Sequence, residues 1–198
     1  GIPEADYTNP TTEQGWQHAL TLPRELHVRN GRLIQQPIKE LLDLRAEHAH
    51  FTTKEDLNQA DSLPLENSFG FPVFETELTF SDCKQMELAL RDGVTLSFSN
   101  GVLTLDLKKG GFGRTSRSVE LTSLSQLRIY SDTTSLEIFV NGGEEVFTTR
   151  LYSQISDPSN DHDLSTNSNA RPLTLTGDCS ATVDVWKLRA FEVSRTQN

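Results

Sequence analysis

The sequence predicts an all-β fold, a two-sheet antiparallel β-sandwich that follows a separate section of strands and a short connector helix. Three observations favour this fold class. From Phe69 onward, apolar and polar residues alternate with a period of two in many short segments. Turn-forming residues separate these segments at regular spacing. Two neighbouring turns independently place the same apolar side chains on one face. A chain of 198 residues can bury one large core, or one domain and a piece of another.

Residues 1–36 differ in character from the rest of the chain. Trp16–Leu26 is interpreted as an extended segment whose Pro23 suits only an edge or the end of a strand. His27–Gln35 contains Asn30-Gly31, the strongest short signal for a hairpin turn. Two or three strands are not stable alone in water. This section must therefore pack against something, and its partner strands are not obvious in the sequence.

Pro37–Arg45 is predicted to form a short helix. Pro37 suits the first helical position, where a missing N–H costs nothing. Ile38, Leu41 and Leu42 fall on one stripe at helical spacing. A helix of this length depends on packing for its stability, so we interpret it as a connector. Polar material from Ala46 to Asn67 follows, with only occasional apolar anchors.

Beyond Phe69 the chain is predicted to consist of strands. Val73–Phe80 and Met86–Leu90 both alternate. A two-residue turn at Asn100-Gly101 predicts a hairpin with six apolar side chains on one face. The predicted pairs are Phe98 with Leu103, Leu96 with Leu105 and Val94 with Leu107. Lys108–Arg117 is interpreted as a glycine-rich basic loop.

The central element is a predicted three-stranded antiparallel meander over Gln126–Arg150. Polar turns at Asp132–Ser135 and Asn141–Glu144 divide it into three strands. Because a slip of one residue would turn every apolar group outward, the agreement between the two turns is informative. The predicted pairs are Ile129 with Ile138, Leu127 with Val140, Ile138 with Phe147 and Phe139 with Val146.

The C-terminal part is predicted to complete the sandwich. A polar loop over Ser156–Ala170 is long for a connection within a domain. Leu173–Thr176 and Ala181–Phe191 are predicted strands. The chain then has about nine to eleven short strands, a number typical of a two-sheet antiparallel sandwich.

The composition and net charge argue against some classes of function. A formal net charge of −10 argues against a nucleic-acid surface, which needs clustered lysine and arginine. No apolar run approaches the roughly 20 residues of a membrane helix, and the N-terminus lacks the pattern of a signal peptide. Cys83 and Cys179 are too few for a disulfide scaffold. We expect two reduced thiols in a cytoplasmic protein, with one long-range bridge as the alternative.

The candidate chemical motifs are weak. Gly110–Gly113 beside two lysines lacks the flanking strand, helix and residue order of a phosphate loop, so we interpret it as a hairpin loop. His48 and His50 have no helical ligand spacing for a metal. Acidic residues such as Glu75 and Glu137 are expected on outward strand positions, and no pair stands out for catalysis. We therefore predict no catalytic or metal-binding residue and no cofactor, and leave any substrate-binding residues unknown.

Several blocks of the sequence are similar to a known family. The run Gly15–Leu26, with its Thr-Leu-Pro-Arg-Glu-Leu core, is the most specific; Asn30–Leu33, Pro37–Arg45 and the segment Ser135–Arg150 follow in the same order. Together these blocks closely resemble the C-terminal part of the β-fructofuranosidases of glycoside hydrolase family 32. This family includes sucrose-6-phosphate hydrolase, invertase and levanase.

The resemblance implies a domain organisation. Family members have an N-terminal five-bladed β-propeller, which holds the active site, and a C-terminal β-sandwich. Residues 1–36 would be the last strands of the fifth blade, residues 37–50 the connector helix and linker, and residues 51–198 the sandwich. Trp16, Pro23 and Arg24 match family positions that we interpret as structural.

The family's catalytic motifs are absent from the sequence. These are an aspartate nucleophile in Asn-Asp-Pro-Asn-Gly, an aspartate in Arg-Asp-Pro and an acid/base glutamate in Glu-Cys. The partial matches Arg91–Gly93, Ser156–Pro158 and Asp82-Cys83 occur in the wrong order and within the sandwich region. No catalytic residue is therefore carried over to this chain.

Two hypotheses for function remain. The first is a C-terminal fragment of a β-fructofuranosidase acting on sucrose, sucrose 6-phosphate or related fructosides, itself inactive and structural. Its partner would be the propeller of the parent enzyme, and it would contact a fructoside substrate only through that propeller. If no propeller is present, the alternative is homo-oligomerisation through residues 1–36. The second is a non-catalytic β-sandwich module that binds a sugar or a partner chain. Neither hypothesis includes a nucleic acid or a membrane.

Overall fold

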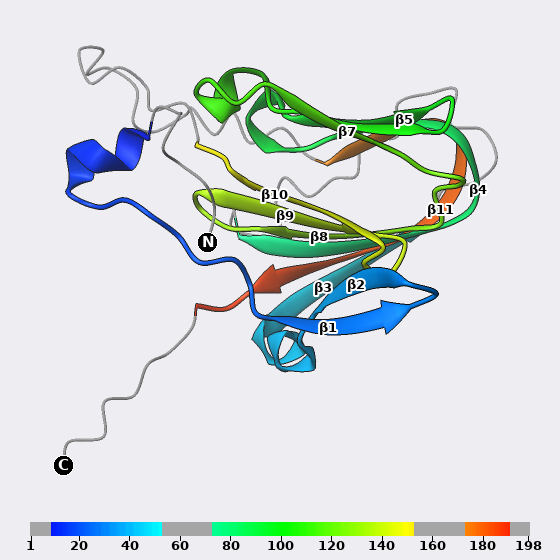
Figure 1. Cartoon of the computed structure of the whole chain (residues 1–198), viewed down its shortest axis with the longest axis horizontal. Coiled ribbons are helices and arrows are strands. Elements are labelled where there is room, and N and C mark those ends of the chain that lie inside the picture. The colour runs from blue at the N-terminus through cyan, green and yellow to red at the C-terminus, as the bar shows by residue number, and fades with distance from the viewer. Residues whose placement is uncertain (1–8, 53–72, 153–172, 191–198) are drawn as a thin grey trace.

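The computed structural model describes residues 9–52, 73–152 and 173–190. Within them, nine strands form one antiparallel sheet that curls into a nearly closed, barrel-like sandwich, and two form a separate hairpin (Figure 1). The strands are β1 (Arg24–Arg29), β2 (Arg32–Pro37), β3 (Arg45–Thr52), β4 (Phe74–Ala89), β5 (Thr95–Ser99), β6 (Val102–Asp106), β7 (Ser116–Glu120), β8 (Gln126–Ser131), β9 (Ser135–Val140), β10 (Glu145–Arg150) and β11 (Thr174–Leu188). Short 3-10 helices are η1 (Pro10–Gln14), η2 (Lys39–Leu44), η3 (Arg91–Gly93) and η4 (Lys108–Gly111).

Two long strands, β4 and β11, run through both layers of the sandwich. The first part of β4, Phe74–Thr79, pairs with β8, and its last part, Gln85–Ala89, pairs with β5. Strand β11 accompanies β4 from one layer into the other. One layer therefore has the order β3-β11-β4-β8-β9-β10 and the other β11-β4-β5-β6-β7. The predicted antiparallel β-sandwich is confirmed, but a single curled sheet supplies both layers instead of two separate sheets.

The prediction of only short strands was wrong at these two places. Most of Val73–Phe80 and of Met86–Leu90 lies in the single strand β4, and most of the described part of the two predicted C-terminal strands lies in β11. The register between β4 and β11 shifts twice near Cys179. Such bulges bend a strand pair without ending it, so the alternation breaks while the strand continues.

The predicted meander register is confirmed, as are two of the three pairs predicted for the β5–β6 hairpin; the third, Val94 with Leu107, lies beyond the end of the strand pair at Thr95 and Asp106. All four pairs predicted for β8, β9 and β10 occur, including Ile129 with Ile138 and Ile138 with Phe147. Leu96 faces Leu105 and Phe98 faces Leu103 across β5 and β6. The side chains of the sandwich core come from both layers, and Ile138 is 0% exposed among them.

The connector differs from the predicted helix. It is the six-residue 3-10 helix η2, while Pro37 ends β2 and Ile38 has extended dihedral angles. The Leu41 N–H donates to the Ile38 carbonyl, a three-residue spacing. So short a segment gains too few hydrogen bonds to offset the cost of nucleating an α-helix.

Two flanking segments also differ from prediction. The polar residues after the connector form β3, which pairs with β11 at the sheet edge, where polar side chains can face water. Before the hairpin, Trp16–Pro23 has no regular structure and the strand begins only at Arg24. The predicted loop Ser156–Ala170 and most of the polar material after Ala46 lie outside the described residues.

Candidate functional site

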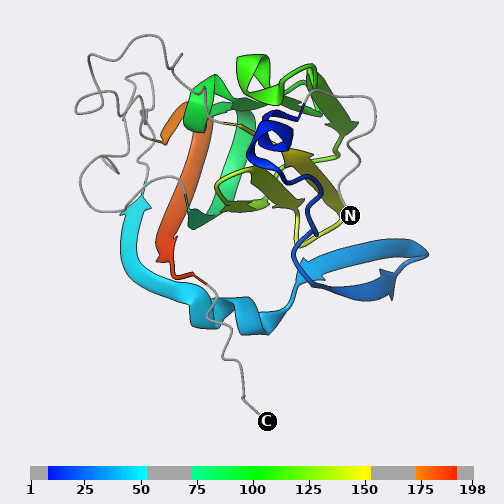
Figure 2. The same ribbon diagram turned by 90° about the vertical axis from the view of Figure 1, so that its left-hand side faces the viewer.

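The hairpin β1–β2 projects from the sandwich (Figures 1 and 2). Its tip is the predicted Asn30-Gly31 turn, where both residues have positive φ, 51° and 75°. Val28 lies opposite Leu33, and Leu26 lies two residues before Val28, so the three share one face of the hairpin. Their exposed fractions are 78%, 52% and 62%. The hairpin therefore presents an apolar face to its surroundings.

The outer edge of the hairpin is open. Within the part of the chain that the structure describes, β1 pairs only with β2. One row of backbone N–H and C=O groups along β1 consequently has no strand beside it. Open edges of this kind template pairing with a further strand.

A buried ion pair anchors the base of the hairpin to the sandwich. Arg24, at the start of β1, bonds Glu137 of β9 and donates to Thr148 Oγ1 of β10 at 2.6 Å. Its other terminal nitrogen donates to Gln35 Oε1 on β2 at 2.9 Å. The Leu22 N–H donates to the second Glu137 oxygen at 2.6 Å. Glu137 is only 3% exposed, because the chain before β1 covers the outer face of β9.

A backbone contact provides a second anchor. In the turn between β9 and β10, Gly143 accepts a hydrogen bond from the Gln35 N–H through its carbonyl, at 3.0 Å. A Cβ at Gly143 would lie 2.0 Å from the Gln35 carbonyl oxygen, and its φ is +93°. Glycine is therefore the residue that lets the turn approach β2 this closely.

Replacing Gly143 with alanine is expected to loosen the hairpin from the sandwich. Amide exchange in β1 and β2 should accelerate roughly tenfold or more, since the added Cβ meets backbone rather than a flexible side chain. Gly142→Ala is the matched control, because Gly142 has φ +69° but its Cβ would meet nothing closer than 3.9 Å. Equal exchange rates in the two variants, measured by mass spectrometry, would show that this contact does not hold the hairpin.

A second buried carboxylate joins the connector region to the sheet. Glu75 of β4 is 0% exposed and accepts bonds from Arg45 Nε at 2.8 Å and from Arg128 Nε at 2.7 Å. Burial acts to raise the pKa of Glu75, but the hydrogen bonds and charges of the two arginines outweigh it and lower the pKa. The Arg45 guanidinium also lies 3.5 Å from the centre of the Trp186 ring.

The expectation that Glu75 and Glu137 point into solvent was wrong. The alternation correctly placed them on the face opposite the sandwich core. That face is covered, however, by Leu22–Arg24 over Glu137 and by Arg45 over Glu75. No pattern in the sequence marks this cover, because it comes from segments 30 to 115 residues away in the chain.

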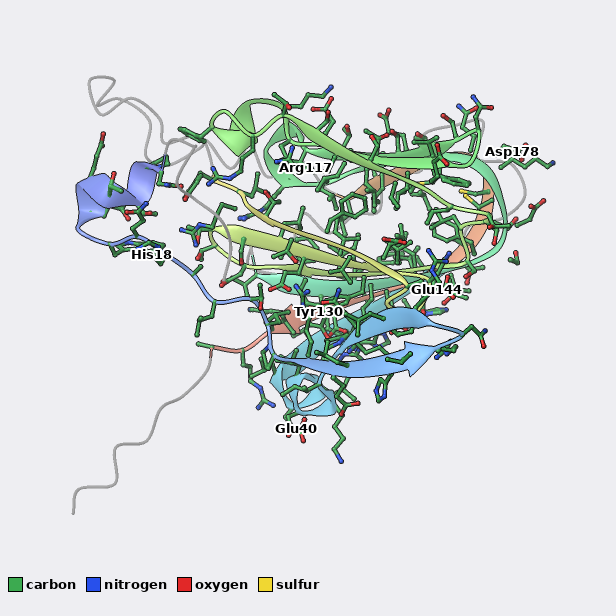
Figure 3. The ribbon with its side chains drawn as sticks, in the orientation of Figure 1. His18, Glu40, Arg117, Tyr130, Glu144 and Asp178 are labelled. Atoms are coloured by element: carbon green, nitrogen blue, oxygen red, sulfur yellow. The ribbon has the colours of Figure 1, made fainter. Side chains whose placement is uncertain are left out.

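A small apolar cluster fills the space between these two ion pairs. Leu41 of the connector packs with Tyr130 of β8 and Phe139 of β9 (Figure 3, where Tyr130 is labelled). Beside it lies a groove of about 630 Å³ lined by the chain before β1, the end of β8 and the end of β11. Leu20 on its wall is 88% exposed. The groove, Leu20 and the apolar face of β1–β2 together form what we call the docking face.

The other residues singled out in the sequence have local roles. His48 and His50 both bond Asp184 Oδ1, at 2.7 and 2.8 Å. Gly110 belongs to the 3-10 helix η4, and its carbonyl accepts the Tyr152 N–H. The Pro23 carbonyl accepts the Ile38 N–H, and the Trp16 ring lies against Arg150.

The buried acidic side chains of the described residues are bound within the fold. Both buried carboxylates among them are held by arginine rather than facing a second acid. No group of three potential metal ligands occurs within these residues. None of the helices described is long and apolar enough to cross a membrane.

Comparison with known proteins identifies the family. Residues 38–187 match the model described as glycosyl hydrolases family 32 C terminal. The chain belongs to glycosyl hydrolase family 32. A probable sucrose-6-phosphate hydrolase of Vibrio cholerae is 34% identical over 155 residues, which cover 77% of this chain and 27% of that protein. Sucrose-6-phosphate hydrolase of Bacillus subtilis is 29% identical over 195 residues, 94% of this chain and 37% of that protein.

Solved structures of a sucrose-6-phosphate hydrolase and a fructan 1-exohydrolase share the fold. The structure of sucrose-6-phosphate hydrolase from Lactobacillus gasseri superposes with a TM-score of 0.71 at 19% identity, covering 93% of this chain and 37% of that one. Fructan 1-exohydrolase IIa from Cichorium intybus gives 0.63 at 16% identity, with 95% and 43% covered. The chain therefore spans less than half the length of each of these relatives.

Proposed function

We propose that the chain is the C-terminal β-sandwich of a β-fructofuranosidase that hydrolyses sucrose, sucrose 6-phosphate or related fructosides. Its own role in this proposal is structural and its location cytoplasmic. The observation that carries the proposal is the hairpin β1–β2, fixed to the sandwich at its base but open along one edge and one face. Sucrose-6-phosphate hydrolases among the relatives support the substrate class.

In this proposal the docking face is the surface that contacts the propeller. Residues 1–36 would supply the last strands of the fifth propeller blade, with the open edge of β1 pairing with an inner blade strand. The exposed side chains of Leu20, Leu26 and Val28 would then lose contact with water. Arg24 and Gly143 would fix the angle between blade and sandwich, because both join the hairpin to the meander.

The domain boundaries follow from the same proposal. In this proposal residues 1–36 belong to the propeller, residues 37–50 form the connector and linker, and residues 51–198 form the sandwich. Strand β3 (Arg45–Thr52) already pairs with the sandwich strand β11. The catalytic acids would lie in the propeller, which implies that the sandwich contributes position and stability rather than chemistry.

The chain alone is expected not to hydrolyse sucrose, sucrose 6-phosphate or inulin. Retaining glycoside hydrolysis needs a carboxylate nucleophile about 5 Å from a second acid, whereas Glu75 and Glu137 are each bound by arginine. Sugar release by the purified chain is the measurement. Turnover that disappears when one of the chain's own acids is replaced would contradict the proposal. Binding of sucrose without turnover, measured by calorimetry, would favour the sugar-binding module instead.

A further inference from the structure

Cys83 and Cys179 lie directly opposite each other on adjacent antiparallel strands. Cys83 is in β4 and Cys179 in β11, and the two are register partners. Both thiols are free, with Cys83 half-buried and Cys179 8% exposed. Opposed residues of an antiparallel pair have Cα atoms about 4.5–5.5 Å apart, which is within the range of disulfides. The two residues are separated by almost half the chain, so the pairing is a property of the fold.

The strand pair is irregular at this point. The register shifts between Asp178 and Cys179 and again between Ser180 and Ala181. Here β4 leaves its pairing with β8, which ends at Thr79, and has not yet begun its pairing with β5 at Gln85. Among the described residues, the corner of β4 therefore has a strand neighbour, β11, on one side alone. Figure 3 labels Asp178 at this corner, where both long strands turn from one layer to the other.

We propose that Cys83 and Cys179 form a reversible cross-strand disulfide when the protein meets a hydroperoxide, locking the corner between the two layers of the sandwich. This modification site is independent of the proposed function, since it uses neither the docking face nor a propeller.

The chemical environment suits Cys179 as the first sulfur to react. Interaction with the Cys83 side chain lowers the pKa of Cys179, although burial acts to raise it. Interaction with Cys179, followed by burial, raises the pKa of Cys83. Hydrogen peroxide is small enough to reach a sulfur that retains only a little exposed surface.

The reaction balances without any further reactant. The Cys179 thiolate attacks one peroxide oxygen; an S–O bond forms, the O–O bond breaks, and the departing hydroxide takes a proton to become water. The Cys83 sulfur then attacks the Cys179 sulfenic acid; the S–S bond forms, the S–O bond breaks, and a second water leaves with the Cys83 proton. The two sulfurs lose two electrons in total, and the two peroxide oxygens gain them.

Intact-mass measurement of the full chain tests the proposal. Treatment with hydrogen peroxide should remove about 2 Da, the two thiol hydrogens, and dithiothreitol should restore them. Peptide mapping should find Cys83 joined to Cys179 within one chain. The bridge closes a loop of nearly a hundred residues, so the melting temperature should rise by roughly 5–15 °C.

Single-cysteine variants complete the test. Cys83→Ser should retain a sulfenic acid at Cys179 that a dimedone probe captures, and should show no rise in melting temperature. Cys179→Ser should react more slowly at Cys83, because it lacks the activated sulfur. Peroxide-treated wild-type protein that keeps two free thiols, gains oxygen atoms without losing hydrogen, or forms bridges only between chains would overturn the proposal. These wild-type results do not depend on how well the variants fold.

Discussion

Glu75→Ala is expected to destabilise the fold by about 3 kcal/mol, because it leaves two guanidinium groups near the sheet without their shared carboxylate. Arg45 and Arg128 both bond Glu75, which is 0% exposed. Urea unfolding at neutral pH measures the loss. Glu47→Ala is the matched control, since Glu47 pairs with Lys187 at the surface and its side chain is 56% exposed. That change should stay within about 0.5 kcal/mol.

The lowered pKa of Glu75 makes the free energy of unfolding depend on pH. The pKa of Glu75 is lowered in the folded protein, so its stabilisation is fully present above the unfolded glutamate pKa of about 4.3. It is lost as the pH falls through the lower folded pKa. The stability difference between wild type and Glu75→Gln should therefore shrink below about pH 4.3. A difference that stays constant or grows in acid would mean that the arginines do not hold the carboxylate ionised.

Ile138→Ala is expected to cost roughly 2–5 kcal/mol, the range for a buried branched side chain whose cavity cannot fully collapse. Ile138 is 0% exposed at the centre of the meander, paired with Ile129 on one side and Phe147 on the other. Thermal or urea unfolding measures the change. Leu33→Ala on the hairpin provides the comparison, because Leu33 is 52% exposed and should matter little in the isolated chain. Equal effects at the two positions would contradict the assignment of core and docking face.

The sequence predicted the parts of the fold that rest on local patterns. Short turns such as Asn30-Gly31 and Asn100-Gly101 determine the register of the strands beside them, and alternation then decides which side chains face the core. The meander was predictable pair by pair for this reason. The resemblance to family 32, carried chiefly by Gly15–Leu26, supplied the family that the comparisons then confirmed.

The parts that depend on distant segments were not predictable. Glu75 and Glu137 occupy outward positions by alternation, and only the fold shows that Arg45 and Arg24 cover them. The continuity of β4 through its bend depends on β11, about a hundred residues later. The pairing of Cys83 with Cys179 has the same origin. A signal was available only for Arg24, which matched a family position interpreted as structural.

The proposed function requires another part of the enzyme to cover the docking face. Mixing this chain with a separately produced family 32 propeller from the Bacillus subtilis relative, followed by light scattering and a sucrose 6-phosphate assay, tests this most directly. We expect a one-to-one complex, activity above that of the propeller alone, and slowed amide exchange along β1. Without the propeller, the chain should self-associate through residues 1–36. The double variant Leu26→Lys/Val28→Lys should abolish both this self-association and the complex with the propeller. A chain that stays monomeric, binds no propeller and already protects the β1 amides would contradict the account.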